Sequence, residues 1–478
     1  MAAPHSPRAL AGWLRLLPLA LALVGALLYV HRIQIDDAFI TYRYAATVAT
    51  SGTLSYGASS SFASTAPGYA VLLGALGALG LDIPTTGGAL GAAAIGLAGV
   101  IAATWIGQRD PLAGGIAGTL IVLSPLAWLV LGMEVNLAVA LVLLGFLLSE
   151  HGHDRGAAVA FAVATLLRFD ALAAAVAWGL WMLVRHRWRA LGVGALYGTL
   201  VLAGHLLLVW GFDAPLFPST LGSKQAQQTL GISGFFPDTS WLEGIALLAR
   251  AYAGQTWLYL AVAALALLGL VLTGHRTASD RPALLVSVWS LLHVLLYHLL
   301  GVTPYLWYYL PLWVVLSVLA ARGAGWLVTA GGHRQGQIAL GVLGAVLLVG
   351  GPVISHARMW QHLQPGTVEP EPTLGTKVLP ELKARPYRAA GEWLAANTPS
   401  HARIGVTEVG ILGYYSQRPM VDFLGLLDGG VAAALSRGDL SWALYARQPD
   451  YLVLSDINPV YGFSIYRDAW FQAAYTAV

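Results

Sequence analysis

The chain has 478 residues, of which 57% are hydrophobic and only 10% are charged, and its mean hydropathy is +0.67. Soluble domains carry about 25% charged residues, so this composition excludes a soluble globular protein and indicates an integral membrane protein. The net charge of +3 comes mostly from arginines beside hydrophobic segments and does not argue for a nucleic-acid partner. The absence of cysteine excludes disulfides and thiolate metal sites.

The acidic residues divide the chain into two parts. Residues 1–355 hold 12 of the 23 acids, and residues 356–478 hold the other 11. We therefore predict a membrane-embedded domain over 1–355 and a water-soluble domain over 356–478. In the second part helical and strand-like segments alternate, which predicts a small α/β domain. Its expected elements are helices near 386–397 and 439–447 and strands near 402–406, 419–422 and 451–454.

Apolar segments of membrane-spanning length recur along the first part. A spanning helix needs roughly 20 apolar residues, and we predict eleven spans, some of them short. They run over approximately 13–30, 86–107, 111–131, 135–149, 157–168, 170–184, 191–211, 255–273, 282–300, 305–321 and 337–355. Residues 67–81 are apolar but too short to span, so we expect an interfacial or re-entrant helix there.

The basic residues predict the orientation of these spans. With a cytoplasmic N-terminus, eleven arginines fall in cytoplasmic segments, whereas the opposite loops of the membrane part hold only Arg32, Arg43, Lys224 and Arg250. This asymmetry follows the positive-inside rule. An odd number of spans then places the C-terminal domain outside the cell (inner) membrane, together with two long loops over 31–85 and 212–254.

Two adjacent carboxylates, Asp36 and Asp37, follow the first apolar segment directly. Apolar residues such as Phe39 and Tyr42 then recur at helical spacing, which predicts a helix lying flat on the membrane surface. In one interpretation Asp36 caps this helix and Asp37 favours its positive N-terminus. In the other, a carboxylate here is a general base that takes a proton from an acceptor hydroxyl. The spacing alone leaves both open.

Four further charged residues stand out in the membrane part. Glu134 lies between two predicted spans, on the same side as Asp36, and is either a loop acid in headgroup water or a second acid of one site. Arg168 and Asp170 interrupt an apolar run, so we expect them to pair with each other or with another site residue. Lys224 is the only lysine before residue 377, and is either a solvated loop residue or a contact for a lipid phosphate.

Other polar and aromatic residues of the spans carry weaker signals. No metal-binding motif accompanies His205, His293 and His298, so we interpret them as polar groups in helix contacts. The aromatic run over 305–309 begins a span and is typical of an aromatic belt at the membrane interface, although sugar stacking is an alternative. The sequence has no nucleotide-binding loop, so an enzyme of this kind takes an activated substrate from elsewhere, and the lipid phase is the obvious source.

These motifs resemble those of membrane-embedded GT-C glycosyltransferases that use polyprenyl-phosphate sugars, especially the bacterial group that includes mycobacterial arabinofuranosyltransferases. Phe169 replaces a proline that is usual in this family, and Ser219 replaces an asparagine. The segments that carry the resemblance are Asp36 to Tyr44, Gly132-Met133-Glu134, Arg168-Phe169-Asp170, Pro218-Ser219-Thr220 with Lys224, and Glu408 to Asp422.

The resemblance implies a GT-C-type bundle and an inverting transfer of a sugar from a polyprenyl-phosphate donor to a hydroxyl of an extracytoplasmic glycan, lipid or protein. It implies that Asp36 is the catalytic base, and that Asp37 and Glu134 orient hydroxyls and stabilise oxocarbenium-like charge. It implies no metal and no cofactor. The donor phosphate and substrate contacts that we expect are Lys224, Arg168, Asp170, Arg43 and Tyr44.

Two other functions stay open at this point. One is a transporter or flippase of lipid-linked glycans, but such proteins more often show repeated halves and sites at the membrane midplane. The other is a non-catalytic membrane scaffold whose outer domain binds a partner.

Overall fold

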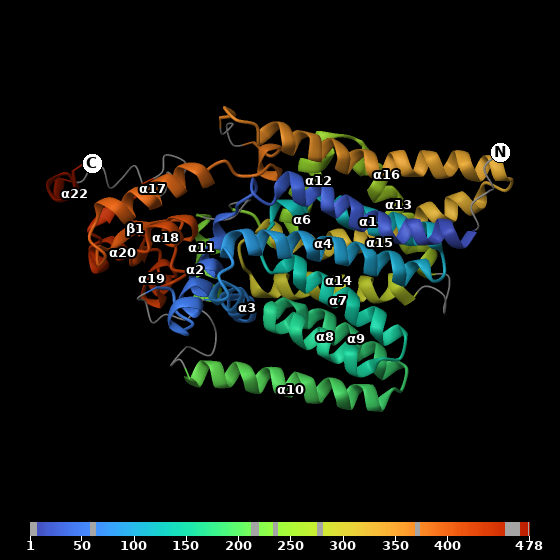
Figure 1. Ribbon diagram of the computed structural model, residues 1–478, viewed down its shortest axis with the longest axis horizontal. Helices are drawn as coiled ribbons and strands as arrows, with labels where there is room; N and C mark the ends of the chain where they lie inside the picture. Colours follow the sequence, from blue (N-terminus) through green and yellow to red (C-terminus); the bar gives the residue numbers. More distant parts are fainter. Residues whose placement is uncertain are drawn as a thin grey trace.

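The computed structural model describes residues 7–57, 64–211, 219–232, 238–274, 281–368, 373–454, 469–476 and 478. Long helices run side by side along the molecule, and a small domain sits at one end of them (Figure 1). The predicted fold class, a helical membrane bundle with a small α/β domain, is confirmed. The parts of the two predicted outer loops over 58–63, 212–218 and 233–237 lie outside the described residues, and so does Pro218 of the resembling motif.

All eleven predicted spans are helical. Within the described residues, seven helical stretches are long and apolar enough to cross a membrane, whereas those over Val135–Glu150, Phe169–Val184 and Leu258–Thr273 are apolar but shorter. The count of eleven spans therefore stays a prediction. The bundle helices are α1 (Pro7–Tyr29), α4 (Ile83–Gly107), α5 (Pro111–Val122), α6 (Pro125–Leu129), α7 (Val135–Glu150), α8 (Asp154–Leu167), α9 (Leu172–Val184), α10 (Trp188–Gly211), α13 (Leu258–Gly274), α14 (Arg281–Leu300), α15 (Leu310–Ala330) and α16 (Arg334–His362).

Glycines let neighbouring bundle helices approach each other closely. A Cβ on Gly118 of α5 would overlap the carbonyl oxygen of Gly99 on α4. Gly269 of α13 and Gly323 of α15 face each other in the same way, each against backbone of the other helix. In a membrane there is no hydrophobic drive between helices, so close van der Waals contact at small residues holds them together. This use of glycine explains part of its high count of 55 in the chain.

Four shorter helices gather outside the main bundle helices. The second predicted loop, 212–254, contains two of them in its described part, and a capping box between Ser240 and Glu243 starts one of these. The helix that begins at Asp36 is covered on both faces by other parts of the protein, and its buried residues include Arg43 and Tyr44. It therefore does not lie exposed on the membrane surface, contrary to what the sequence pattern predicted. The four are α2 (Asp36–Ser51), α3 (Pro67–Ala78), α11 (Ser219–Leu230) and α12 (Trp241–Gln255). The described chain also has three short 3-10 turns, η1 (Phe169–Ala171), η2 (Leu306–Tyr309) and η3 (Thr376–Val378).

The C-terminal domain is built on a three-stranded parallel sheet in the order β2-β1-β3. Ile404 of β1 pairs with Met420 of β2 and with Tyr451 of β3. The alternation of helix and strand predicted these strands, but three of the short helices were not predicted, namely α18, α19 and α22. The elements are α17 (Ala384–Asn397), β1 (Ile404–Val406), α18 (Gly410–Ser416), β2 (Met420–Asp422), α19 (Gly429–Leu435), α20 (Trp442–Arg447), β3 (Tyr451–Leu452) and α22 (Ala469–Ala474).

The domain docks onto the bundle through α18, which packs against α2 near the same end of the molecule (Figure 1). The Tyr56 hydroxyl donates a hydrogen bond to the Val409 carbonyl oxygen at 2.5 Å, and the Phe39 and Tyr414 rings lie 5.5 Å apart. Gly410 lies directly on the backbone of Asp36, where a Cβ would overlap the Asp36 carbonyl oxygen. The short sequence around Gly410 is therefore shaped for contact with α2.

We predict that Gly410→Ala loosens the docking of the C-terminal domain, because the added methyl group has no space against Asp36. Hydrogen exchange of the amides of α18 and α2 measures this, and we expect faster exchange in both helices. Gly429→Ala is the matched control, since a Cβ there meets no atom within 4 Å. Equal exchange in the two variants would contradict the proposed role of Gly410.

Candidate active site

The Asp36 carboxylate binds the N-terminus of α18. The amides of Gly410 and Ile411 donate hydrogen bonds to Oδ2 and Oδ1 of Asp36, at 3.0 and 2.7 Å. The capping interpretation was therefore wrong for the helix that Asp36 begins: the N-cap of α2 is Ile35, and no side chain caps it. Asp36 is buried, and burial raises its pKa from 3.8 to about 7, with the negative charge of Glu408 adding to the rise.

Asp37 is the more accessible of the two carboxylates, since it is only half-buried. Burial raises the pKa of Asp37, whereas the positive charges of Lys224 and Lys383 lower it. The negative charges of Glu408 and Glu134 raise it further. Charged side chains of both the bundle and the C-terminal domain therefore act on Asp37. Within the described residues, no hydrogen bond involves its carboxylate.

The C-terminal domain contributes an ion-pair cluster that the sequence did not single out. Lys383, the residue before α17, lies 2.6 Å from Oε1 of Glu408 and 3.1 Å from Oε2 of Glu381. Both carboxylates raise the pKa of Lys383 well above its usual value despite burial, so this lysine stays charged. Lys383 and Glu381 belong to no motif, whereas Glu408 opens the resembling segment 408–422. The docking of the domain brings all three beside Asp36 and Asp37.

Glu134 is positioned by a tight turn that two tyrosines hold. Gly132 has a φ of +92°, a left-handed conformation that glycine adopts without a steric penalty. Its carbonyl oxygen accepts hydrogen bonds from the hydroxyls of Tyr42 on α2 and Tyr69 on α3, each at 3.1 Å. The turn therefore fixes Glu134 at the start of α7 relative to the helix that carries Asp36 and Asp37.

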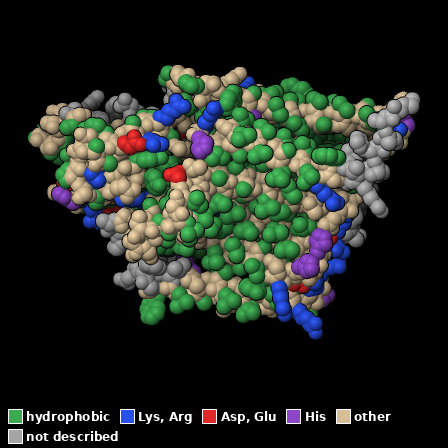
Figure 2. Space-filling view, viewed as in Figure 1, with side chains coloured by type: hydrophobic (Ala, Val, Ile, Leu, Met, Phe, Trp, Pro, Cys, Tyr) green, Lys and Arg blue, Asp and Glu red, His purple; other side chains and the backbone are tan. Residues whose placement is uncertain are grey.

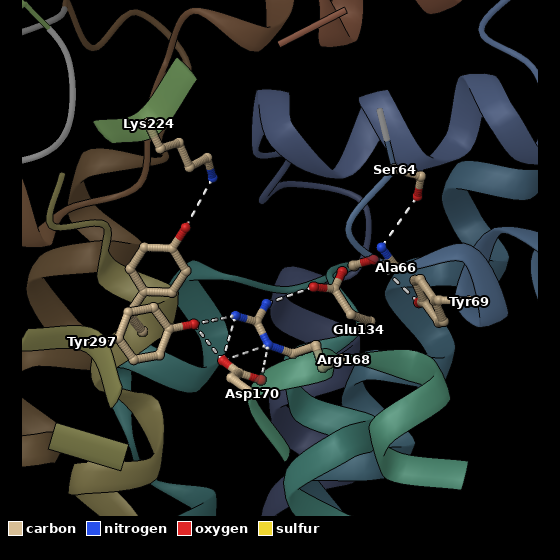
Figure 3. Close-up of polar contacts among 10 residues, drawn as sticks. Ser64, Ala66, Tyr69, Glu134, Arg168, Asp170, Lys224 and Tyr297 are labelled. Atoms are coloured by element: carbon tan, nitrogen blue, oxygen red, sulfur yellow. Dashed lines mark hydrogen bonds and ion pairs between the residues drawn. The ribbon is translucent and has the colours of Figure 1, made fainter. Parts of the chain in front are cut away.

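Arg168 links Asp170, its neighbour in the sequence, to Glu134. Its Nη1 lies 2.6 Å from Oε1 of Glu134, and its Nε and Nη2 donate to Asp170 at 2.9 and 2.8 Å (Figure 3). The Tyr297 hydroxyl completes the group with a 2.6 Å hydrogen bond to Asp170. Both alternatives predicted for this pair hold, since Arg168 binds its neighbour and another acid. With its guanidinium committed to these partners, Arg168 is a fixed support for Glu134.

Lys224 extends from α11 into an aromatic cage. Its Nζ donates a hydrogen bond to the Tyr308 hydroxyl at 3.0 Å, drawn as the dashed line from Lys224 in Figure 3. The same Nζ lies 4.6 Å from the ring centre of Tyr305 and 5.2 Å from that of Trp307. The aromatic run is therefore buried around a cation and does not form the interfacial belt that we expected. Lys224 is itself buried, and within the described chain no carboxylate lies within ion-pair distance of it.

The C-terminal domain also holds the helix that carries Lys224. The Ser223 hydroxyl donates to the Gly425 carbonyl oxygen, and the Gln227 side-chain amide donates to the Leu424 carbonyl oxygen at 2.9 Å. Both acceptors lie in the turn after β2. The domain therefore contacts both α2 and α11, the two helices that carry Asp37 and Lys224.

Arg43 and Tyr44 lie about 10 Å further along α2 than the carboxylates. Tyr44 is fully buried and packs edge-on against Tyr56, with ring centres 5.7 Å apart. The Arg43 guanidinium lies 5.9 Å from the same ring, and its Nε and Nη1 have no hydrogen-bond partner within the described residues. Their expected contact with substrate stays a prediction.

Two of the three histidines are bundle contacts: His205 packs edge-on against Phe169, whereas His298 is exposed at the end of α14. His293 is buried, and its Nε2 lies 2.8 Å from the Tyr308 carbonyl oxygen. Within the described part of the chain, no three His, Asp or Glu side chains form a cluster suited to a metal ion. His293 instead helps to hold the turn that carries the aromatic cage.

Comparisons with known proteins bear on both parts of the chain. Residues 380–478 match a family described as a domain of unknown function, DUF8728. No curated protein is similar enough in sequence to match. The fold is similar to that of ArnT from Cupriavidus metallidurans in the apo state, with a TM-score of 0.57, 17% identity, and coverage of 89% of this chain and 88% of that one. ArnT bound to undecaprenyl phosphate gives a TM-score of 0.55, 18% identity, and coverage of 91% and 88%.

We predict that Asp36→Asn changes how stability depends on pH. The fold favours protonated Asp36, because its pKa of about 7 lies above the ordinary value of 3.8. Asp36 therefore contributes most stability near pH 4, and this contribution is lost as the pH rises to about 7, with a slope of up to about 1.4 kcal/mol per pH unit. Asparagine does not titrate, so thermal unfolding between pH 4.5 and 8 should show a flatter profile. Parallel profiles for the variant and the wild type would sink this assignment.

Proposed function

We propose that the protein is a glycosyltransferase that takes a sugar from a polyprenyl-phosphate donor. The observation that carries the proposal is the position of Asp37, an accessible carboxylate within electrostatic reach of the caged Lys224 and of Glu134. The fold supports it, because ArnT is a GT-C glycosyltransferase and one of its structures contains undecaprenyl phosphate. A carboxylate base beside a cation for a leaving phosphate is the arrangement that such a transfer requires.

In this proposal, Lys224 binds the donor phosphate. Its charge is shielded from water by aromatic rings and has no carboxylate partner within the described chain, so an entering phosphate would be its first anionic partner. An ammonium group is a compact point charge that suits a phosphate monoester or diester. Arg168 supports the site indirectly, because Glu134 and Asp170 already bind its guanidinium.

We propose Asp37, in preference to Asp36, as the base. Both oxygens of Asp36 accept backbone hydrogen bonds, whereas Asp37 is half-buried and more accessible. In this proposal Asp36 holds the C-terminal domain in place beside Asp37. The raised pKa of Asp37 suits a base, because a carboxylate accepts a proton more readily when its pKa is closer to the working pH.

The reaction follows from these roles. Asp37 takes the proton of an acceptor hydroxyl, and the resulting oxygen forms a bond to the anomeric carbon of the donor sugar. The bond from that carbon to the phosphate oxygen breaks on the opposite face, so the configuration inverts and polyprenyl phosphate leaves with the electron pair. Lys224 neutralises the leaving phosphate, and Glu134 orients sugar hydroxyls and stabilises oxocarbenium-like charge. The acceptor is a hydroxyl of a glycan, a lipid or a protein.

We also propose that the end of the bundle that carries the candidate site and the C-terminal domain faces the extracytoplasmic side. Arg109 follows α4, Arg185 and Arg187 lie between α9 and α10, and Arg189 lies in the first turn of α10. These segments are at the end of the bundle away from the C-terminal domain (Figure 1). Loops rich in arginine stay on the cytoplasmic side of a membrane. A polyprenyl-phosphate donor would then reach Lys224 from the outer leaflet.

We predict that Asp37→Asn lowers sugar transfer by about 100-fold to 10,000-fold, the usual contribution of a general base. Purified protein is incubated with a panel of polyprenyl-phosphate sugars and an acceptor extract, and released polyprenyl phosphate is measured by mass spectrometry. Glu392→Gln on the exposed face of α17 is the control, and we expect it to keep full activity. Release of no polyprenyl phosphate by the wild type from any donor would refute the function, whereas normal turnover by Asp37→Asn would refute only the base.

We predict that Lys224→Gln raises the KM for the lipid donor about tenfold, because a charged hydrogen bond to the phosphate is lost. Glutamine keeps a donor near Tyr308, so the aromatic cage should remain intact. Arg250→Gln removes an exposed positive charge from α12 and is the matched control. An unchanged KM together with normal donor binding in the Lys224 variant would exclude a phosphate contact.

A further inference from the structure

A polar cavity lies at the opposite end of the bundle from Asp37. Helix α7 starts beside Glu134 and ends at Glu150, and its 16 residues span about 24 Å. The cavity has a volume of about 60 Å³ and lies where the ends of α7, α9 and α14 meet. Its polar lining comes from Ser149, Glu150, Arg185, Arg187 and Arg281, and the Trp181 indole lies beside them.

Positive charge exceeds negative charge around this cavity. Glu150 is its one lining acid within the described chain, and it is already bound by Arg109 and by the indole N–H of Trp105, the latter at 3.3 Å. Arg281 is held only loosely by the same acid, with 3.7 Å between Nη1 and Oε1. The arginines that line the cavity therefore carry positive charge that the nearby carboxylate does not fully neutralise.

The other two lining arginines differ in how they are held. Arg187 pairs with Asp154 at 2.7 Å. Arg185 has no carboxylate within ion-pair distance in the described chain, and its guanidinium lies 5.8 Å from the Trp181 ring centre. Basic side chains gather at this end of the bundle, next to a broad hydrophobic surface (Figure 2), and they are arginines because the sequence has no lysine in these segments. The local excess of charge is thus about two, from four arginines and two acids.

Exposed apolar side chains lie beside the cavity on the helices that form it. Leu180, Leu183 and Val184 of α9 are 46%, 45% and 68% exposed, and Leu284 of α14 is 40% exposed. In a membrane such side chains contact lipid acyl chains. A polar, positively charged hollow that adjoins an acyl-chain surface matches a lipid whose headgroup is anionic.

We propose that this cavity binds the phosphate of an anionic membrane lipid, with Arg185 and Arg281 as its main contacts. Guanidinium groups bind phosphate oxygens in a bidentate fashion, and basic pockets between membrane helices are suited to anionic headgroups. The indole of Trp181 holds Arg185 in place at the membrane interface, where tryptophan is favoured. This inference is independent of the proposed sugar transfer, because the cavity and Glu134 lie at opposite ends of α7.

Native mass spectrometry of the purified full-length protein tests the proposal with phosphatidylglycerol, the zwitterionic phosphatidylethanolamine and inorganic phosphate as separate probes. We expect phosphatidylglycerol to be retained in preference to phosphatidylethanolamine. We expect Arg185→Gln and Arg281→Gln each to lower phosphatidylglycerol affinity about fivefold, the effect of one basic residue near an anionic lipid. Thermal unfolding should rise with phosphatidylglycerol in the wild type and less so in the variants.

The control is Arg388→Gln with Arg403→Gln, which removes two exposed charges from the C-terminal domain. It should leave lipid retention unchanged. Equal retention of the two lipids, equal loss in the control, or displacement of phosphatidylglycerol by millimolar inorganic phosphate would each overturn the lipid assignment. If the Arg281 variant misfolds, Arg185→Gln still tests the proposal. Within the described chain Arg185 forms no ion pair and contacts only the Trp181 ring, so its replacement should not disturb folding.

Discussion

The hydrogen bonds from the α18 amides to the Asp36 carboxylate join the two parts of the molecule. A buried carboxylate without partners would be costly, and the N-terminus of α18 supplies two amides that face it. The rest of the candidate site depends on this contact. It brings the Lys383 cluster beside Asp37, and the same domain holds α11 through the turn after β2. The docking of the C-terminal domain therefore sets the relative positions of Asp37 on α2, Lys224 on α11 and Lys383 at the start of α17.

The two basic residues of the site differ in whether their charge is neutralised by carboxylates. Arg168 is saturated by Glu134, Asp170 and Tyr297, so it acts as a rigid support. Lys224 is held by aromatic rings, which stabilise a cation without neutralising it. The difference explains why two basic residues of similar burial are suited to different tasks. A guanidinium fork matches two carboxylates, whereas an ammonium in a cage keeps its charge for a ligand.

Sequence patterns predicted the helices and strands well and the contacts of the site less well. The apolar segments, the polar break at Arg168 and the alternation in the C-terminal part all depend on local composition, which is visible in one dimension. The partner of Asp36 was not predictable, because Gly410 and Ile411 contribute backbone amides that carry no side-chain signal. Lys383 was missed for a related reason: it gains importance only from the docking of a distant domain. The composition of the aromatic run at 305–309 is typical of an interfacial belt. Only its position around Lys224 in the structure shows that it is a buried aromatic cage.

The bond between Asp36 and α18 also has a consequence for how each molecule is made. The two partners of the Asp36 carboxylate are 374 and 375 positions further along the chain. At about 5–20 residues per second, the ribosome needs roughly 20–75 s to reach them after making Asp36. Throughout that interval the bundle helices can assemble while α2 lacks the surface that covers it. A newly made molecule thus acquires its complete charge arrangement last, and a chain that stops before β1 would lack both amides that bind the Asp36 carboxylate.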